Sequence, residues 1–121
     1  MPESLKVAFV LDDTELTDLA SAAGLPPEAV HQVVHGQGEE AVEDLQDVIF
    51  GNSVSLVLLP TLARLAEDLM TQETILASWA ERGIKVYSKA EPDLGSGDPA
   101  RQLIRSVVSE IDSYGHIPWV P

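Results

Sequence analysis

The chain has 121 residues, 45% of them hydrophobic, and it contains no cysteine. This length suits one domain with a buried core, and we expect a single domain over residues 1–121. The absence of cysteine excludes a disulfide framework, a thiolate metal site and a cysteine nucleophile. No apolar stretch approaches the roughly 18 to 20 residues of a membrane span, and the start MPESLK lacks the pattern of a signal peptide. We therefore expect a cytoplasmic protein without a membrane segment.

The net charge of −13 is unevenly distributed along the chain. Up to Ala63 there are eleven acidic residues and one base, Lys6, whereas the remainder has nine acidic and six basic residues. Nucleic-acid binding usually requires a positive patch that releases counterions from phosphates. The charge therefore predicts weak DNA binding or none, and it leaves room for only a small basic patch around Arg64, Arg101 and Arg105.

The first half of the chain alternates apolar runs with helical patterns. Leu5–Leu11 (LKVAFVL) predicts a buried strand, and Glu15–Ala23 predicts a helix that ends at Gly24 and the prolines after it. Val30–Val34 is either a short second strand or the middle of a short helix. Glu39–Ile49 has apolar residues at helical spacing and two glutamates in its first turn, where the helix dipole favours them.

The second half contains a strand, a helical pattern and another strand. The apolar run Val54–Leu59 is followed by the helical pattern LARLAEDLMTQETILASWAERG (62–83) and by a second apolar run, Ile84–Ser88. Two strands joined by a crossover helix form a βαβ unit with parallel strands. Together with Leu5–Leu11, this unit predicts an α/β fold, a three-layer α/β/α sandwich around a mainly parallel sheet of four or five strands. We expect these three strands in the middle of the sheet, because strands buried on both faces form continuous apolar runs.

A helix with well-marked ends follows the loop AEPDLGSGDP. Asp98 is its predicted N-cap, Pro99 occupies its first position, and Gly115 follows its end. The tail Ile117–Pro121 comes after this helix, and its two prolines bracket Trp119. The apolar residues of the helix form one stripe, which must be buried somewhere: Ala100, Leu103, Ile104, Val107, Val108 and Ile111.

Four segments of the second half occur in an order typical of a known family. They are LVLLPTLARLAEDL, AERGIKVYSKAEP, SGDPARQLI and the helix ending in EIDSYG. They resemble the arginine-containing motif after a strand, the E-R-G strand, the small-residue turn and the long dimerisation helix of serine site-specific recombinases, the resolvase and invertase family. The first strand, KVAFVLDDTE, is similar to the strand that delivers the nucleophilic serine in the catalytic domain of that family. The resemblance implies a resolvase-like fold.

The residues that carry recombination chemistry in the family are replaced here. Where the family has Arg-x-Ser-Thr after the first strand, this chain has LDDT, which places Asp13 at the serine position and removes the arginine. In the second motif, Ala63 replaces an aspartate, Arg64 retains one arginine and Glu67 replaces the other. Phosphoryl transfer depends on cations that stabilise the charged transition state. The resemblance therefore implies a degenerate, inactive site at Leu11, Asp13, Ala63, Arg64 and Glu67.

The strings FVLDD and SLVLLP also resemble a response-regulator receiver domain, in which an acidic pair after the first strand binds magnesium beside a phosphorylatable aspartate. Asp12 and Asp13 match the acidic pair, and Lys89 is a candidate for the lysine of that family. Pro60 stands where the phosphate acceptor is expected. This resemblance implies a Mg²⁺ site at Asp12 and Asp13. The alternative, which we favour, is that both aspartates are solvated and cap the turn between strand and helix.

Residues 15–36, ELTDLASAAGLPPEAVHQVVHG, have the spacing of a helix-turn-helix, with Gly24 at the turn. The second helix would expose Gln32 and His35 but no arginine or lysine, and so it would lack the cations that contact phosphates and guanine. A helix followed by a strand of the sheet explains the same residues and also the strand before them. We favour that interpretation, and we expect His31, His35 and His116 to be scattered surface residues.

These observations predict a binding module rather than an enzyme, with no cofactor apart from the Mg²⁺ considered above. The resemblance to recombinases implies a homodimer through the last helix, with the candidate residues Leu103, Ile104, Val107, Val108 and Ile111. Two alternatives remain open. One is a DNA-associated recombination accessory protein that uses the small basic patch, and the other is a cation-binding pseudo-receiver domain that uses the aspartate pair.

Overall fold

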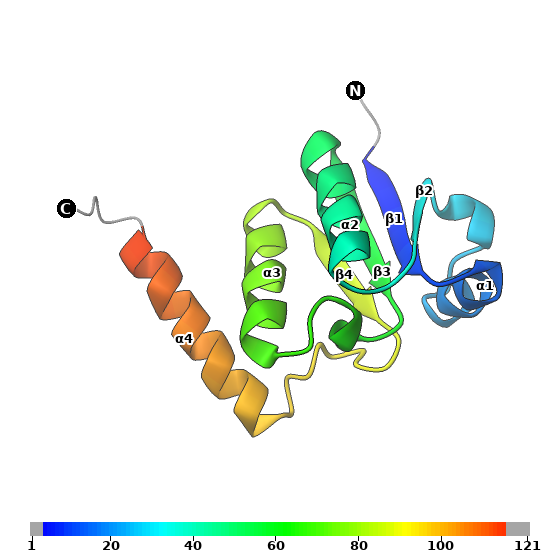
Figure 1. Ribbon diagram of the computed structural model, residues 1–121. Coiled ribbons are helices and arrows are strands. Elements are labelled where there is room, and N and C mark those ends of the chain that lie inside the picture. Colours follow the sequence, from blue (N-terminus) through cyan, green and yellow to red (C-terminus); the bar gives the residue numbers. More distant parts are fainter. Residues whose placement is uncertain (1–3, 116–121) are drawn as a thin grey trace.

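The computed structural model describes the backbone of residues 4–115 and the side chains of residues 4–110. It contains a sheet of four parallel strands in the order β2-β1-β3-β4. Figure 1 shows this sheet and the helices around it. The prediction of an α/β fold with a parallel sheet is therefore confirmed. The strands are β1 (Leu5–Val10), β2 (Gln32–His35), β3 (Val54–Leu59) and β4 (Lys85–Ser88).

The position predicted for the last strand is wrong. The strands β1 and β3 lie in the middle as expected, but β4 lies at an edge of the sheet that the described residues form. Lys85 of β4 is exposed, and Val86 and Tyr87 are only half-buried. A short apolar run is compatible with either position, because an edge strand can also bury its residues against the helices above it.

Helices cover both faces of the sheet, which gives the predicted three layers (Figure 1). On one face lies α1 (Asp13–Ala22), and on the other lie α2 (Glu39–Gly51) and α3 (Leu69–Glu81). The α1 side is a small cluster in which Leu19 contacts the strand residues Ala8, Val10 and Leu58. Burial on both faces explains why β1 and β3 are nearly continuous apolar runs.

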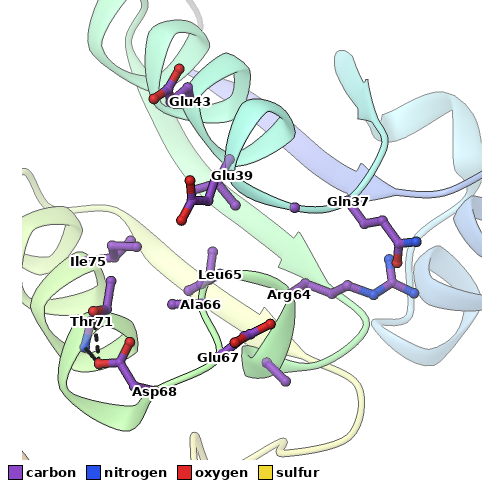
Figure 2. A pocket seen from close by; sticks show the side chains of 13 residues that line it. Gln37, Glu39, Glu43, Arg64, Leu65, Ala66, Glu67, Asp68, Thr71 and Ile75 are labelled. Carbon is purple, nitrogen blue, oxygen red and sulfur yellow. Dashed lines mark hydrogen bonds between the residues drawn. The ribbon is translucent and has the colours of Figure 1, made fainter.

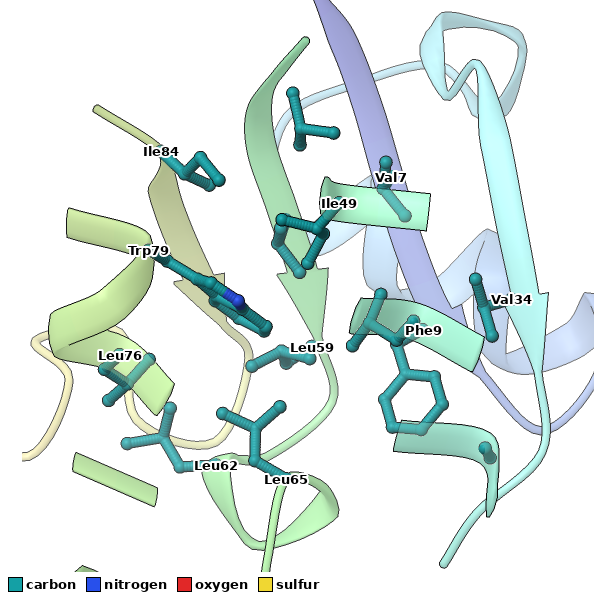
Figure 3. Packing of buried hydrophobic residues seen from close by; sticks show 14 residues of the cluster. Val7, Phe9, Val34, Ile49, Leu59, Leu62, Leu65, Leu76, Trp79 and Ile84 are labelled. Atoms are coloured by element: carbon teal, nitrogen blue, oxygen red, sulfur yellow. The ribbon is translucent and has the colours of Figure 1, made fainter. Parts of the chain in front are cut away.

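The larger part of the core lies between the sheet and the pair α2 and α3 (Figure 3). Trp79 of α3 is fully buried there. Its indole N–H donates to Oε1 of Gln46 at 2.8 Å, so the polar group of this large side chain is satisfied. The same core cluster includes Phe9, Leu45, Ile49, Leu59 and Leu62.

The helix predicted over residues 62–83 is shorter in the structure. After β3 the chain forms a 3₁₀ turn, η2 (Leu62–Arg64), and α3 begins only at Leu69. Asp68 caps α3, because its side chain accepts the backbone N–H of Thr71 at 2.8 Å. The leucines before the cap, Leu62 and Leu65, are buried in the core. Their helix-like spacing therefore reflects burial by a turn rather than a continuous helix.

The region from residue 15 to residue 36 forms α1, a 3₁₀ turn η1 (Pro27–Ala29) and β2. The helix-turn-helix interpretation is therefore wrong, and the strand alternative for Val30–Val34 is confirmed with slightly later bounds. The end of β2 pairs in parallel with β1, with His35 beside Val10. Gly24 provides the turn after α1 with a φ of +77°, a conformation that favours glycine.

The last helix is α4 (Pro99–Gly115), which contacts α3 and runs away from the sheet (Figure 1). Its predicted cap is confirmed, because the backbone N–H of Ala100 donates to Oδ1 of Asp98 at 3.0 Å. Gly115 is the last residue of the helix rather than the first residue after it. The predicted tail, Ile117–Pro121, lies outside the described residues. Within the described part of the chain, no helix combines the length and apolar character needed to cross a lipid bilayer.

Candidate functional site

The carboxyl ends of two neighbouring strands bring together the positions that the recombinase resemblance identified. Leu11 and Asp13 follow β1, while Ala63, Arg64 and Glu67 follow β3. Arg64 is half-buried, and the other four residues are exposed. In open α/β sheets this edge is where ligands usually bind. All five positions therefore lie at the carboxyl edge of the sheet, and their role stays a prediction.

The retained arginine is already paired with a carboxylate. Arg64 Nη1 and Nη2 lie 2.9 and 2.7 Å from Oε1 and Oε2 of Glu15, which is a bidentate ion pair. The backbone N–H of Leu11 also donates to Glu15 Oε1, at 2.8 Å. The hydrogen bond from Arg64 is the main reason why the pKa of Glu15 is lowered. A phosphate could reach this guanidinium only in competition with Glu15.

The aspartate pair is divided between two different roles. Asp12 is the N-cap of α1, and its Oδ1 accepts the backbone N–H of Glu15 at 2.8 Å. Asp13 Oδ1 lies 3.5 Å from Nε2 of His35, at the end of β2, and the side chain of Asp13 is 93% exposed. Among the described side chains there is no group of three or more His, Asp or Glu residues that could hold a metal ion. The capping interpretation of Asp12 is confirmed, and a Mg²⁺ site at Asp12 and Asp13 stays a prediction.

The other predicted histidines are quickly placed. His31 precedes β2, and its Nδ1 accepts the backbone N–H of Lys6 at 2.9 Å. This hydrogen bond links the side chain of His31 to the backbone of β1, and so His31 has a structural role. His116 lies outside the described residues.

Two hollows open at the carboxyl edge. The smaller one has a volume of about 320 Å³, and Asp12, Pro60 and Lys89 are among its lining residues. These are three of the four positions that the receiver resemblance identified, and the fourth, Asp13, is not part of this lining. The larger cleft has a volume of about 770 Å³ and lies between the start of α2 and the connection from β3 to α3 (Figure 2). Its lining includes Arg64 and four carboxylates, from Glu39, Glu43, Glu67 and Asp68.

The remaining arginines of the expected basic patch anchor α4 on α3. Arg101 Nη1 lies 2.8 Å from Glu73 Oε2, and Arg105 Nε lies 2.7 Å from Glu73 Oε1. The Glu73 side chain is only 3% exposed. Arg101 also donates to the side chain of Gln72, and Arg105 to the carbonyl oxygen of Leu94, both at 2.8 Å. All three arginines of the predicted patch are thus paired with carboxylates rather than free to contact phosphates.

The local electrostatics and the backbone both fit this arrangement. Burial raises the pKa of Glu73, but the hydrogen bonds from Arg105 and Arg101 outweigh burial and leave that pKa below its ordinary value. The same contact with Glu73 raises the pKa of Arg105. Gly95 has a φ of +72°, and a Cβ atom there would lie 2.5 Å from Cδ of Arg101. A glycine at this position therefore lets the loop pass directly over the arginine.

Sequence reasoning missed Glu15 and Glu73, the two residues that hold these arginines. Glu15 carries no local signal, because its partner is 49 residues away along the chain. Glu73 does carry one, since it lies three residues before the buried Leu76 and so falls on the buried face of α3. A carboxylate on an apolar face requires a cation, and Arg101 lies three residues before the apolar Ile104 on α4.

The apolar stripe of α4 is divided between two surroundings. Val108 is buried against α3, and Ile104 is half-buried. Leu103 and Val107 face outward, with 68% and 37% of their surfaces exposed. The side chain of Ile111 lies outside the described residues. One monomer therefore leaves part of the stripe uncovered.

The fold is that of a resolvase-like α/β domain. A similar solved structure is the N-terminal catalytic domain of TP901-1 integrase, with a TM-score of 0.56 and 18% sequence identity. The match covers 91% of this chain and 95% of that domain. The resemblance predicted from the sequence is thereby confirmed for the fold. No protein-family model matches this chain, and no curated protein matches it.

Proposed function

We propose that this chain is a catalytically inactive resolvase-like domain that works as a dimerisation and protein-interaction module. The observation that carries this proposal is the ion pair between Arg64 and Glu15, with the uncovered apolar face of α4 as its complement. The first feature argues against recombination chemistry, and the second supports a role in binding.

The case against catalysis rests on charge. Phosphoryl transfer on DNA requires cations around the phosphate. Here Asp13 and Glu67 are exposed carboxylates at the carboxyl edge, and the guanidinium of Arg64 is neutralised by Glu15. The anionic phosphate backbone of DNA would therefore be repelled from this edge of the sheet. We expect DNA binding to be weak and to disappear as the salt concentration rises.

The case for self-association rests on α4. This helix is held to the rest of the molecule mainly through α3, and Leu103 and Val107 point away from that contact. A second copy could cover the same residues around a two-fold axis, so that each helix buries the apolar face of the other. Such burial is favourable by about 25 cal/mol for each Å² of apolar surface removed from water.

Sedimentation velocity tests this proposal, and two substitutions on α4 separate its parts. Wild-type protein is expected to form dimers at concentrations on the order of tens of micromolar. Leu103→Asp would place an unpaired charge in the interface at a cost of several kcal/mol, and we expect a folded monomer. Val108→Asp should instead disturb the contact with α3 and lower the melting temperature. A wild-type chain that stays monomeric would overturn the proposed dimer.

A further inference from the structure

The larger cleft at the carboxyl edge has two acidic walls and an apolar floor (Figure 2). Glu39 and Glu43 project from α2, one helical turn apart, and Glu67 comes from the loop before α3. Leu65 and Ile75 lie between these walls, and of the two the half-buried Ile75 presents the more accessible apolar surface. The volume of about 770 Å³ is within the range typical of ligand pockets, roughly 300–1,000 Å³. The cleft therefore offers both shape and apolar contact, in addition to charge.

The charge of this cleft is not balanced from within. Arg64 is the single basic residue among the described residues that line the cleft, and both of its terminal nitrogens bind Glu15. Asp68 uses its carboxylate to cap α3. Glu39, Glu43 and Glu67 form no ion pair with any described side chain. Like charges one helical turn apart destabilise a helix, so a bound cation would relieve a repulsion that the free protein retains.

We propose that this cleft binds a basic segment of a partner protein, with an aliphatic side chain on the floor and lysine or arginine side chains against the walls. The inference rests on the proposed function as an interaction module, but it uses a surface separate from α4. Nucleic acid is excluded as the occupant because phosphates would face three carboxylates. A polyamine would satisfy the walls but has no side chain to cover the half-buried Ile75, and so we assign the cleft to a peptide.

Fluorescence anisotropy with a defined probe tests this assignment. The probe is a short fluorescein-labelled peptide of lysine, leucine and glycine, and a second peptide has glycine in place of each leucine. The cleft variant is Glu43→Lys with Glu67→Lys. Its control is Asp44→Lys with Asp47→Lys, which changes the net charge equally at exposed positions of α2 that do not line the cleft. Circular dichroism confirms that each variant is folded.

We expect the cleft variant to lose about tenfold or more in affinity for the leucine peptide, because two attractive contacts become repulsive. The control should bind nearly as tightly as the wild type, and the peptide without leucine should bind more weakly. Equal losses in both variants would mean general attraction to an acidic surface, and would overturn the proposal. Displacement by spermidine as effective as that by unlabelled peptide would overturn the peptide assignment.

The same measurement on Leu103→Asp separates this inference from the proposed dimer. If the monomeric variant binds the peptide normally, the cleft acts within one chain and does not depend on self-association. A wild-type protein that dimerises but does not bind the peptide would overturn the cleft assignment and leave the dimer standing.

Discussion

The same chemistry, an arginine bound to a glutamate, occurs in two regions of this molecule with different consequences. At the carboxyl edge, Arg64 and Glu15 keep 18% and 25% of their side-chain surfaces exposed. At the junction of α3 and α4, Arg101 and Glu73 keep only 7% and 3%. The first pair lies where a ligand would approach, and the second lies inside the packing of two helices.

This difference in burial separates what each pair contributes. An ion pair near the surface adds little stability, about 0–1 kcal/mol, because water screens both charges. A buried charge that loses its partner is far more costly. The pair at the carboxyl edge therefore acts mainly by keeping the guanidinium of Arg64 bound to Glu15. The pair at the junction instead determines whether α4 stays packed against α3. Three experiments test this contrast, in order of decreasing effect.

The largest effect is expected for Glu73→Ala. It would leave Arg101 buried without a carboxylate and Arg105 with only the carbonyl oxygen of Leu94. Removing one partner of a buried ion pair costs about 3–5 kcal/mol, and we expect a loss of unfolding free energy near the lower figure because Arg105 is partly exposed. Urea denaturation followed by circular dichroism measures this loss. The matched change at the other pair, Glu15→Ala, should cost about 1 kcal/mol or less.

Equal losses for the two alanine variants would contradict the contrast. Glu73→Gln provides a further control, because it keeps the shape and one hydrogen-bond acceptor but removes the charge. The unfolding free energy of Glu73→Gln should lie between those of the wild type and of Glu73→Ala.

Acidification should weaken the molecule through the same carboxylates. The pKa values of Glu15 and Glu73 in the folded protein lie below their ordinary value of 4.5. Groups with a depressed folded pKa contribute stability above the unfolded pKa, and this contribution is lost as the pH falls through the folded pKa. Unfolding free energy should therefore decrease as the pH drops below about 4.5. Glu73→Gln should flatten this decrease, and a variant that keeps the full pH dependence would exclude Glu73 as its source.

Much of the fold could be predicted because its signals are local. The apolar runs of β1 and β3, the N-cap at Asp98 and the repeated helical spacing each depend on a few consecutive residues. The errors arose where local signals are ambiguous. Leu62 and Leu65 have helical spacing, yet α3 begins only after them, because Asp68 caps the helix at a later position. The position of β4 depends on which strands lie beside it, which a single run of apolar residues does not reveal.

The candidate site was less predictable because its key contacts are distant in sequence. Sequence order placed Arg64 and Asp13 on the same edge, through the resemblance to recombinases. It gave no indication that Glu15, rather than Asp13, would bind the arginine. The same limitation applies to Arg101, whose partner Glu73 is 28 residues away. The three arginines of the predicted patch look free in the sequence, but each is paired with a carboxylate in the structure.

The smallest effect is expected for Asp13→Ser, which restores a hydroxyl at the position of the recombinase nucleophile. We expect no activity, because a serine nucleophile requires neighbouring cations and Arg64 remains bound to Glu15. The measurement is incubation with supercoiled DNA followed by denaturing electrophoresis, which detects a covalent protein–DNA adduct. Asp13→Ser combined with Glu15→Gln would free Arg64, yet Leu11 and Glu67 would still stand at the positions of the two arginines that the resemblance implies for phosphoryl transfer, and we expect no adduct there either. An adduct formed by the wild type or by Asp13→Ser alone would show that the Arg64–Glu15 pair does not prevent chemistry at this edge.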